Sequence, residues 1–133
     1  PGQRTQPQKG HGDRHAPQPW DGSLVDLAVP ARVDPGDPVV RTARRRAADA
    51  AHAAAAAIVA GDAAALGAAM NTTFDQRASV MELDPRHLAM IEVARTNGAA
   101  ANYTGSGGAV VVLARDDRAR RALEELGCRI LAL

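Results

Sequence analysis

A glycine-rich segment is the part of this sequence whose residue types best suit ligand binding. It reads Thr104-Gly105-Ser106-Gly107-Gly108 and separates two segments with the composition of β-strands, 100–104 and 109–113. Glycines accept positive φ angles and let the backbone approach a ligand closely. The hydroxyls of Thr104 and Ser106, beside exposed N–H groups, suit the oxygens of a phosphate or carboxylate. A tight hairpin turn without a ligand would use the same residues, so both interpretations stay open.

The residues around the glycines exclude several other types of site. No Gly-Lys-Ser/Thr follows, so the segment is not a Walker A loop, and a strand follows where a dinucleotide fingerprint has a helix. Cys128 is the only cysteine, which excludes an internal disulfide and a cysteine-based zinc site. We expect no metal site in this chain, and no side chain stands out as a catalytic residue.

The elements that must position this segment are predicted from capping and helix-breaking residues. Aspartates and Asp-Pro pairs mark helix starts, and glycines mark helix ends, which predicts helices at 39–60, 63–79, 85–97 and 118–126. β-branched and apolar composition predicts strands at 24–29, 100–104, 109–113 and 128–133. The first helix is expected to pack through a face of small residues, formed by Val40, Ala43, Ala47, Ala51, Ala54 and Ile58.

The order of these elements predicts an α+β fold. Two strands meet across the glycine turn and helices flank them, which favours a two-layer sandwich: a mixed or antiparallel sheet of about four strands with helices on one face. Residues 1–22 are rich in Pro, Gln, Gly and His, and we expect them to be a disordered or non-native tail. One domain is therefore assigned to residues 23–133.

The composition narrows the class of protein. The 133 residues carry a net charge of +1 and three aromatic side chains, which argues against a nucleic-acid-binding protein. Alanine contributes 30 residues, and no apolar run reaches the roughly 18–20 residues that span a bilayer. No secretory signal is visible, so we expect a cytoplasmic protein whose partners include neither nucleic acid nor a membrane.

The segments that flank the glycines form a recognisable series. Residues 91–99 read Ile-Glu-Val-Ala-Arg-Thr-Asn-Gly-Ala, and Gly61-Asp62, Leu66-Gly67 and Met70-Asn71 precede them. Together with Thr-Gly-Ser-Gly-Gly, this series resembles the C-terminal domain of the GHMP kinases, the superfamily of galactokinase, homoserine kinase, mevalonate kinase and phosphomevalonate kinase. The run from Met70 to Arg77 is especially similar to glucuronokinase-type sugar kinases, with Thr73 where a second Asn is expected.

The resemblance implies ATP-dependent phosphorylation of a hydroxyl on a small molecule, such as a sugar or sugar acid, and a ferredoxin-like α+β fold. In the family, an N-terminal half carries the phosphate loop, the magnesium-site acid and the catalytic acid, and this chain contains none of them. The small-molecule substrate and the nucleotide are the implied partners, and ATP and Mg²⁺ are expected to bind mainly to an N-terminal half in cis or in trans. The chain alone is therefore expected to hold no cofactor and to be inactive.

The resemblance also implies site residues. The loop Thr104–Gly108 is expected to shape the phosphate side of the active site, and Asn71, Asp75 and Arg77 are expected on the substrate side. Two other interpretations stay open: a stand-alone module that binds a small molecule, a phosphate or a partner protein without catalysis, and a degenerate gene.

A basic cluster in the first predicted helix invites a separate interpretation. We expect it to be a solvated helix face, partly ion-paired with Asp37 and Asp49. Its members are Arg41, Arg44, Arg45 and Arg46. Under the sugar-acid interpretation, Arg44 or Arg45 would contact the substrate carboxylate.

Overall fold

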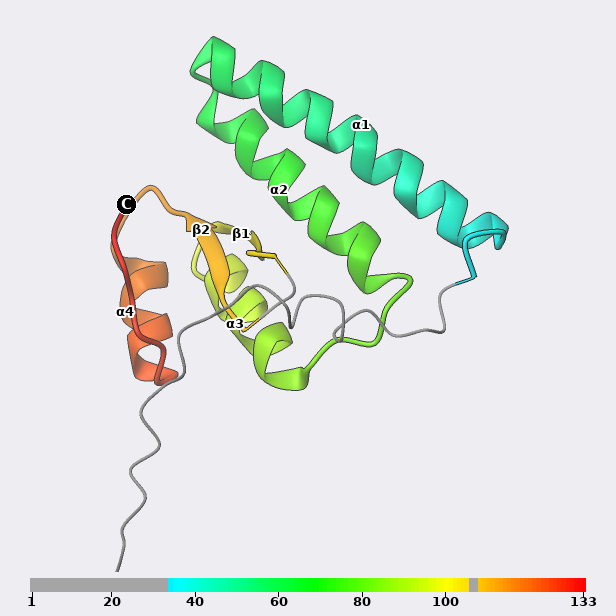
Figure 1. Cartoon of the computed structure of the whole chain (residues 1–133). Helices are drawn as coiled ribbons and strands as arrows, with labels where there is room; N and C mark the ends of the chain where they lie inside the picture. The colour runs from blue at the N-terminus through cyan, green and yellow to red at the C-terminus, as the bar shows by residue number, and fades with distance from the viewer. Residues whose placement is uncertain (1–33, 106–107) are drawn as a thin grey trace, which may run out of the picture.

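The computed structural model describes residues 34–105 and 108–133. The predicted tail (1–22), the predicted strand at 24–29, and Ser106 and Gly107 of the glycine segment therefore lie outside the described residues. The described part has an α+β fold, in which three helices precede two strands and a fourth helix follows them (Figure 1). The elements are α1 (Pro38–Ala60), α2 (Ala63–Ala78), α3 (Pro85–Thr96), β1 (Ala100–Tyr103), β2 (Val110–Leu113) and α4 (Arg118–Glu125).

Three helices begin at aspartates, as predicted. The side chains of Asp37, Asp62 and Asp84 each accept a hydrogen bond from a backbone N–H of the first turn, at 2.7, 2.9 and 2.8 Å. These bonds satisfy donors for which the helix itself has no acceptor. Gly61 ends α1 with a φ of 67°, the left-handed conformation that glycine adopts without strain. The turn at this glycine folds α2 back along α1.

α1 and α2 form a hairpin in which the two helices lie side by side (Figure 1). The residues that α1 buries are Val40, Ala43, Ala50 and Ala57. The prediction that Ala51 and Ile58 belong to the packed face is wrong, because both are exposed. The second half of this helix is mostly alanine, so its sequence contains no apolar stripe that would select one side.

β1 and β2 pair in antiparallel fashion across the glycine segment. Their register runs from Ala100 opposite Leu113 to Tyr103 opposite Val110. The predicted sheet of about four strands is not found, because the described residues contain these two strands and no others.

The predicted strand at 128–133 is irregular in the structure. The N–H of Cys128 donates to the carbonyl of Leu123 at 2.9 Å, so this donor completes the end of α4 instead of a strand ladder. Cys128 and Ile130 still pack against the core. The segment therefore contributes apolar contacts to the fold but no strand to the sheet.

α2 packs against β1. The side-chain oxygen of Asn71 accepts the N–H of Ala101 at 3.1 Å. Gly67 lies close to Ala100, because a Cβ added to it would be 3.1 Å from the Cβ of Ala100. α2 therefore meets β1 through a hydrogen bond at Ala101 and through close packing of Gly67 against Ala100.

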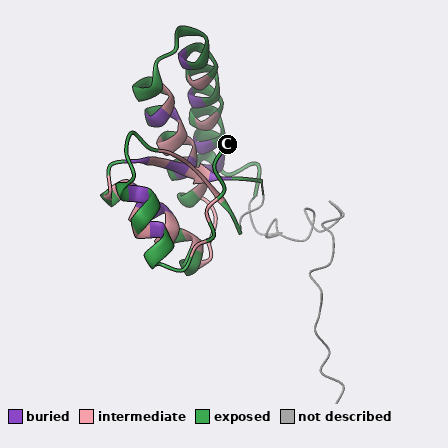
Figure 2. Ribbon diagram, turned by 90° about the vertical axis from the view of Figure 1, so that its left-hand side faces the viewer, coloured by how far each residue is buried: buried purple, intermediate pink, exposed green. Residues whose placement is uncertain are grey.

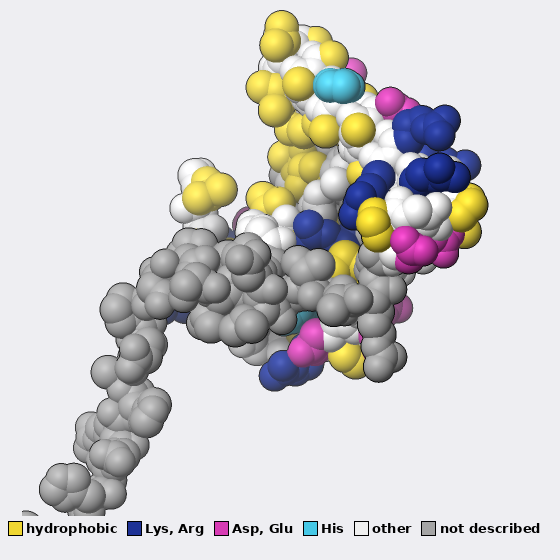
Figure 3. Space-filling model, turned by 45° about the vertical axis from the view of Figure 1, so that its right-hand side comes forward, with side chains coloured by type: hydrophobic (Ala, Val, Ile, Leu, Met, Phe, Trp, Pro, Cys, Tyr) yellow, Lys and Arg dark blue, Asp and Glu magenta, His cyan; other side chains and the backbone are white. Residues whose placement is uncertain are grey.

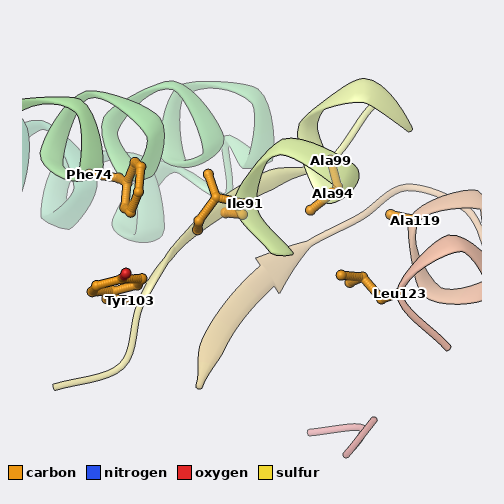
Figure 4. Close-up of a cluster of buried hydrophobic side chains, with 8 residues drawn as sticks. Phe74, Ile91, Ala94, Ala99, Tyr103, Ala119 and Leu123 are labelled. Atoms are coloured by element: carbon orange, nitrogen blue, oxygen red, sulfur yellow. The ribbon is translucent and has the colours of Figure 1, made fainter. Parts of the chain in front are cut away.

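The core lies where α2, α3 and α4 meet the strands. Figure 4 shows Phe74 and Tyr103 at one end of the cluster, Ile91 and Ala94 in the middle, and Ala119 and Leu123 at the other end. In Figure 2 the buried residues lie on the sides of helices that face other elements. No helix among the described residues is both long and apolar enough to cross a bilayer.

We expect Gly67→Val to destabilise the fold. A Cβ at this position would lie 3.1 Å from the Cβ of Ala100 and 3.8 Å from Cδ2 of Leu113, so a larger side chain pushes α2 away from β1. Overpacking of this kind typically costs about 1–3 kcal/mol. The matched control is Ala64→Val, at an exposed position of the same helix. Urea unfolding measures both variants, and equal free energies of unfolding would contradict the close approach.

Candidate functional site

The glycine segment forms a loop that is closed at its base. The backbone N–H and the hydroxyl of Thr104 both donate to the carbonyl oxygen of Ala109, each at 3.2 Å. Gly105 and Gly108 have φ angles of 62° and 83°, which residues with a Cβ rarely adopt. A Cβ added to either glycine meets no atom within 4 Å. Backbone conformation therefore favours glycine at both positions, and no described atom lies close to where a Cβ would be.

The structure brings Arg77 from the end of α2 to this loop. Its Nη1 donates to the carbonyl oxygen of Gly105 at 2.9 Å, across 28 residues of sequence. Its guanidinium carbon lies 5.5 Å from the centre of the Tyr103 ring. Within the part of the chain that the structure describes, Arg77 forms no ion pair. One of the three residues expected on the substrate side thus lies directly beside the predicted phosphate loop.

The other two expected substrate-side residues are bound to Arg95 of α3. Arg95 donates from Nε to the side-chain oxygen of Asn71 at 3.1 Å and from Nη2 to its backbone carbonyl at 3.0 Å. Its Nη1 forms a 2.7 Å ion pair with Asp75. The same guanidinium lies 5.2 Å from the centre of the Phe74 ring. Because Asn71 also accepts the N–H of Ala101, this group of residues links α2, α3 and β1.

Two residues of this region, Arg95 and Tyr103, were not predicted as site residues. Arg95 lies in the segment that carries the family resemblance, where its position four residues after Ile91 places it on the same side of the helix. Tyr103 immediately precedes the glycine segment and is the only tyrosine in the chain. A polar aromatic residue next to a candidate loop is a signal that sequence reasoning can use.

Tyr103 supports the base of the loop from within the core. Its side chain is 9% exposed and makes edge-to-face contacts with Phe74 and His87, at ring-centre distances of 5.3 and 5.5 Å. Its hydroxyl is buried, and no described residue is hydrogen-bonded to it. Burial raises the pKa of this phenol, the negative charge of Asp84 raises it further, and the positive charge of Arg77 opposes both.

Asp84 is itself held by a neighbouring arginine at the start of α3. The hydrogen-bonded guanidinium of Arg86, 2.7 Å away, and a hydrogen bond from the Arg86 backbone N–H keep the pKa of the Asp84 carboxyl well below its usual range. The carboxylate therefore stays charged at every physiological pH and keeps capping α3.

The basic cluster of α1 lies on the surface. Its members Arg41, Arg44, Arg45 and Arg46 are all exposed. The expected ion pairs with Asp37 and Asp49 do not form in the described part of the chain. In Figure 3, basic side chains gather at one end of the hairpin and hydrophobic ones at the other. The prediction that these arginines form a solvated helix face is confirmed. The prediction that some of them pair with Asp37 and Asp49 is not confirmed.

The remaining surface offers less chemistry. A shallow groove of about 480 Å³ runs between α1 and α2, lined by Arg46, Asp49, Thr72 and five alanines. None of its lining residues belongs to the glycine loop or is hydrogen-bonded to Arg95. In the described residues, no three His, Cys, Asp or Glu side chains gather as metal ligands do.

We expect Asn71→Leu to destabilise the protein and Asn71→Asp to retain its stability. Both groups that approach the side-chain oxygen of Asn71 are donors, so a carboxylate satisfies them and leucine leaves them unpaired. An unsatisfied buried donor costs about 1–3 kcal/mol. Thermal unfolding tests both variants against Thr72→Leu, at the exposed neighbouring position. Equal losses for the leucine and aspartate variants would show that the acceptor is unimportant.

We also expect Tyr103 to ionise above the ordinary tyrosine pKa of about 10. A folded-state pKa above the unfolded one means that stability is complete below pH of about 10 and falls as the pH rises through the folded pKa. Tyrosinate absorbance reports this residue alone, since the chain has one tyrosine. The same titration in denaturant provides the unfolded reference. Coinciding folded and unfolded curves would contradict the burial of this hydroxyl.

The series of segments around the loop has counterparts in known proteins. Residues 54–132 match the model of the family described as GHMP kinases C terminal. Two curated relatives from Arabidopsis thaliana are similar over 118 residues: probable glucuronokinase 2, at 36% identity, and glucuronokinase 1, at 33% identity. No solved structure gives a significant match.

The extent of these matches defines what is shared. Each alignment covers 86% of this chain but 32% or 33% of the relative, so the chain spans about a third of the length of these glucuronokinases. The family match includes α2, α3, both strands, the glycine loop and α4. The chain therefore belongs to the GHMP kinase family and contains its C-terminal domain.

Proposed function

We propose that this chain is the C-terminal part of an ATP-dependent kinase that phosphorylates a hydroxyl of a sugar or sugar acid. The observation that carries the proposal is the contact between Arg77 and Gly105, which puts a cation beside an open glycine loop in a chain of the GHMP kinase family. The names of the two relatives, both glucuronokinases, favour a sugar acid as the substrate.

The requirements of phosphoryl transfer can be met by two parts of one enzyme, this chain and an N-terminal half. Such reactions depend on positioning the phosphates and on neutralising their charge with metal ions and cationic side chains. The loop of Thr104, Gly105 and Gly108 provides open backbone, and Arg77 provides a positive charge. By analogy with the family, ATP and Mg²⁺ would be held mainly by an N-terminal half, in cis or in trans.

The substrate side involves the three predicted residues unequally. Arg77 is bonded to the Gly105 carbonyl, so on this side of the site it lies nearest to the glycine loop and would act through it. Asn71 and Asp75 are engaged with Arg95, so their contribution is to shape this side of the site. Ser106 and Gly107 complete the proposed phosphate side, although they lie outside the described residues.

A stand-alone binding module is the second candidate. The observation in its favour is that α2, α3, α4 and the strands close a hydrophobic core among themselves. Such a unit would bind a sugar phosphate or a partner protein without catalysis.

Assays of the full natural polypeptide and of this chain alone distinguish the two functions. The kinase proposal expects ADP release from ATP that depends on a sugar acid such as glucuronate in the full polypeptide, and none with the chain alone. Calorimetry of the chain with sugar acids, sugar phosphates and ATP tests the second function. An inactive full polypeptide together with tight binding by the chain would favour the module and overturn the kinase.

We expect Gly108→Ala to reduce the phosphorylation rate of the full polypeptide. The φ of 83° disfavours any residue with a Cβ, and the left-handed conformation costs about 1–2 kcal/mol, so the loop shifts to relieve the strain. Gly61→Ala is the matched control, because Gly61 has a φ of 67° and open space but lies at the far hairpin turn. We expect both variants to lose a similar amount of folding stability. Only Gly108→Ala is expected to lower the phosphorylation rate. Full activity of the Gly108→Ala variant would contradict the proposal that the glycine loop is part of the active site.

A further inference from the structure

The contact between Arg77 and the loop carries an inference about how the loop is held. We propose that Arg77 is a positioning residue that fixes the glycine loop through the carbonyl of Gly105, an inference that rests on the proposed kinase function. The 2.9 Å hydrogen bond from Nη1 reaches the first glycine of the loop, the residue with a φ of 62°. A hydrogen bond to this carbonyl restrains the backbone at Gly105.

The guanidinium is oriented by the ring beneath it. Arg77 lies 5.5 Å from the centre of the Tyr103 ring, within the range of a cation–π contact. Tyr103 is itself fixed by edge contacts with Phe74 and His87 and is 9% exposed. A buried ring on the strand that leads into the loop thus lies against the guanidinium of Arg77. The geometry of the loop is therefore tied to the core through two contacts.

The charge of Arg77 is not neutralised within the described residues. The nearest acid along its helix, Asp75, is ion-paired with Arg95 at 2.7 Å, and Asp84 is ion-paired with Arg86 at 2.7 Å. The carbonyl of Gly105 is a neutral acceptor, so the bond leaves a full positive charge beside the loop. A preorganised cation at this place favours anionic oxygens without further rearrangement.

A direct ligand role for Arg77 makes a different prediction from a positioning role. An arginine that binds the sugar acid itself would mainly determine the KM for that substrate. An arginine that acts through the loop would mainly determine kcat, because the misplaced loop affects the transferring phosphoryl group after both substrates are bound. The two roles are therefore separated by which kinetic constant changes.

The kinetic test uses the full natural polypeptide with Arg77→Met, Arg77→Lys and the control Arg120→Met. Arg120 is a surface arginine of α4, bonded to Glu124 at 3.2 Å. We expect Arg77→Met to lower kcat about 10- to 100-fold with the KM for glucuronate unchanged. Arg77→Lys keeps a charged donor and should restore part of the rate, and Arg120→Met should resemble the wild type. A raised KM with unchanged kcat, or an equal loss in Arg120→Met, would overturn the positioning role.

A second test needs no catalytic activity. Nuclear magnetic resonance relaxation of this chain reports the motion of the Gly105 and Gly108 amides. We expect Arg77→Met to lower their order parameters while Arg120→Met leaves them unchanged, and unchanged values in Arg77→Met would overturn the inference. An inactive wild-type polypeptide would instead defeat the proposed kinase function, and the relaxation result would still decide whether Arg77 holds the loop.

Discussion

The guanidinium of Arg95 is hydrogen-bonded to Asn71 where α2, α3 and β1 come together. The position of the end of α2 beside the glycine loop depends on this interaction. Two donors of the guanidinium bond Asn71 and a third bonds Asp75, while Asn71 accepts the N–H of Ala101. A planar group with several donors in a fixed fork imposes one geometry on its acceptors. A shift of α2 along β1 would disturb these bonds together, because one guanidinium joins both acceptor residues. The end of α2, which carries Arg77, is thereby held at the level of the loop.

Asn71, Asp75 and Arg77 were expected together on the substrate side, but the structure divides them into two groups. Asn71 and Asp75 are bonded to Arg95, and Arg77 is bonded to the glycine loop. The group around Arg95 is partly buried and joins α2, α3 and β1. Arg77 instead lies beside the loop, and no described residue forms an ion pair with it. The division suits a kinase whose C-terminal domain shapes one wall of the active site. Family membership agrees with this arrangement, since the match spans both groups and the loop. In the proposed enzyme, metal binding and nucleotide binding would fall mainly to the other half.

The features that the sequence predicted well are those with local causes. Asp37, Asp62 and Asp84 cap helices through bonds that span two or three residues, so helix starts follow from residue type and spacing. The helix end at Gly61 and the turn between the strands depend on glycine conformations in the same way. The prediction of a strand at 128–133 is wrong. The N–H of Cys128 donates to the carbonyl of Leu123 in α4 and not to a neighbouring strand.

The sequence by itself determined the helix boundaries, the position of the glycine loop and the family to which the chain belongs. Tertiary structure alone decided which side of the alanine-rich α1 is buried, because alanines on every side leave the helix without a preferred face. It also separated Arg77 from Asn71 and Asp75, which lie within seven residues of one another in a single helix. Their roles differ because their partners, the Gly105 carbonyl and the Arg95 guanidinium, come from distant segments that only folding brings to α2.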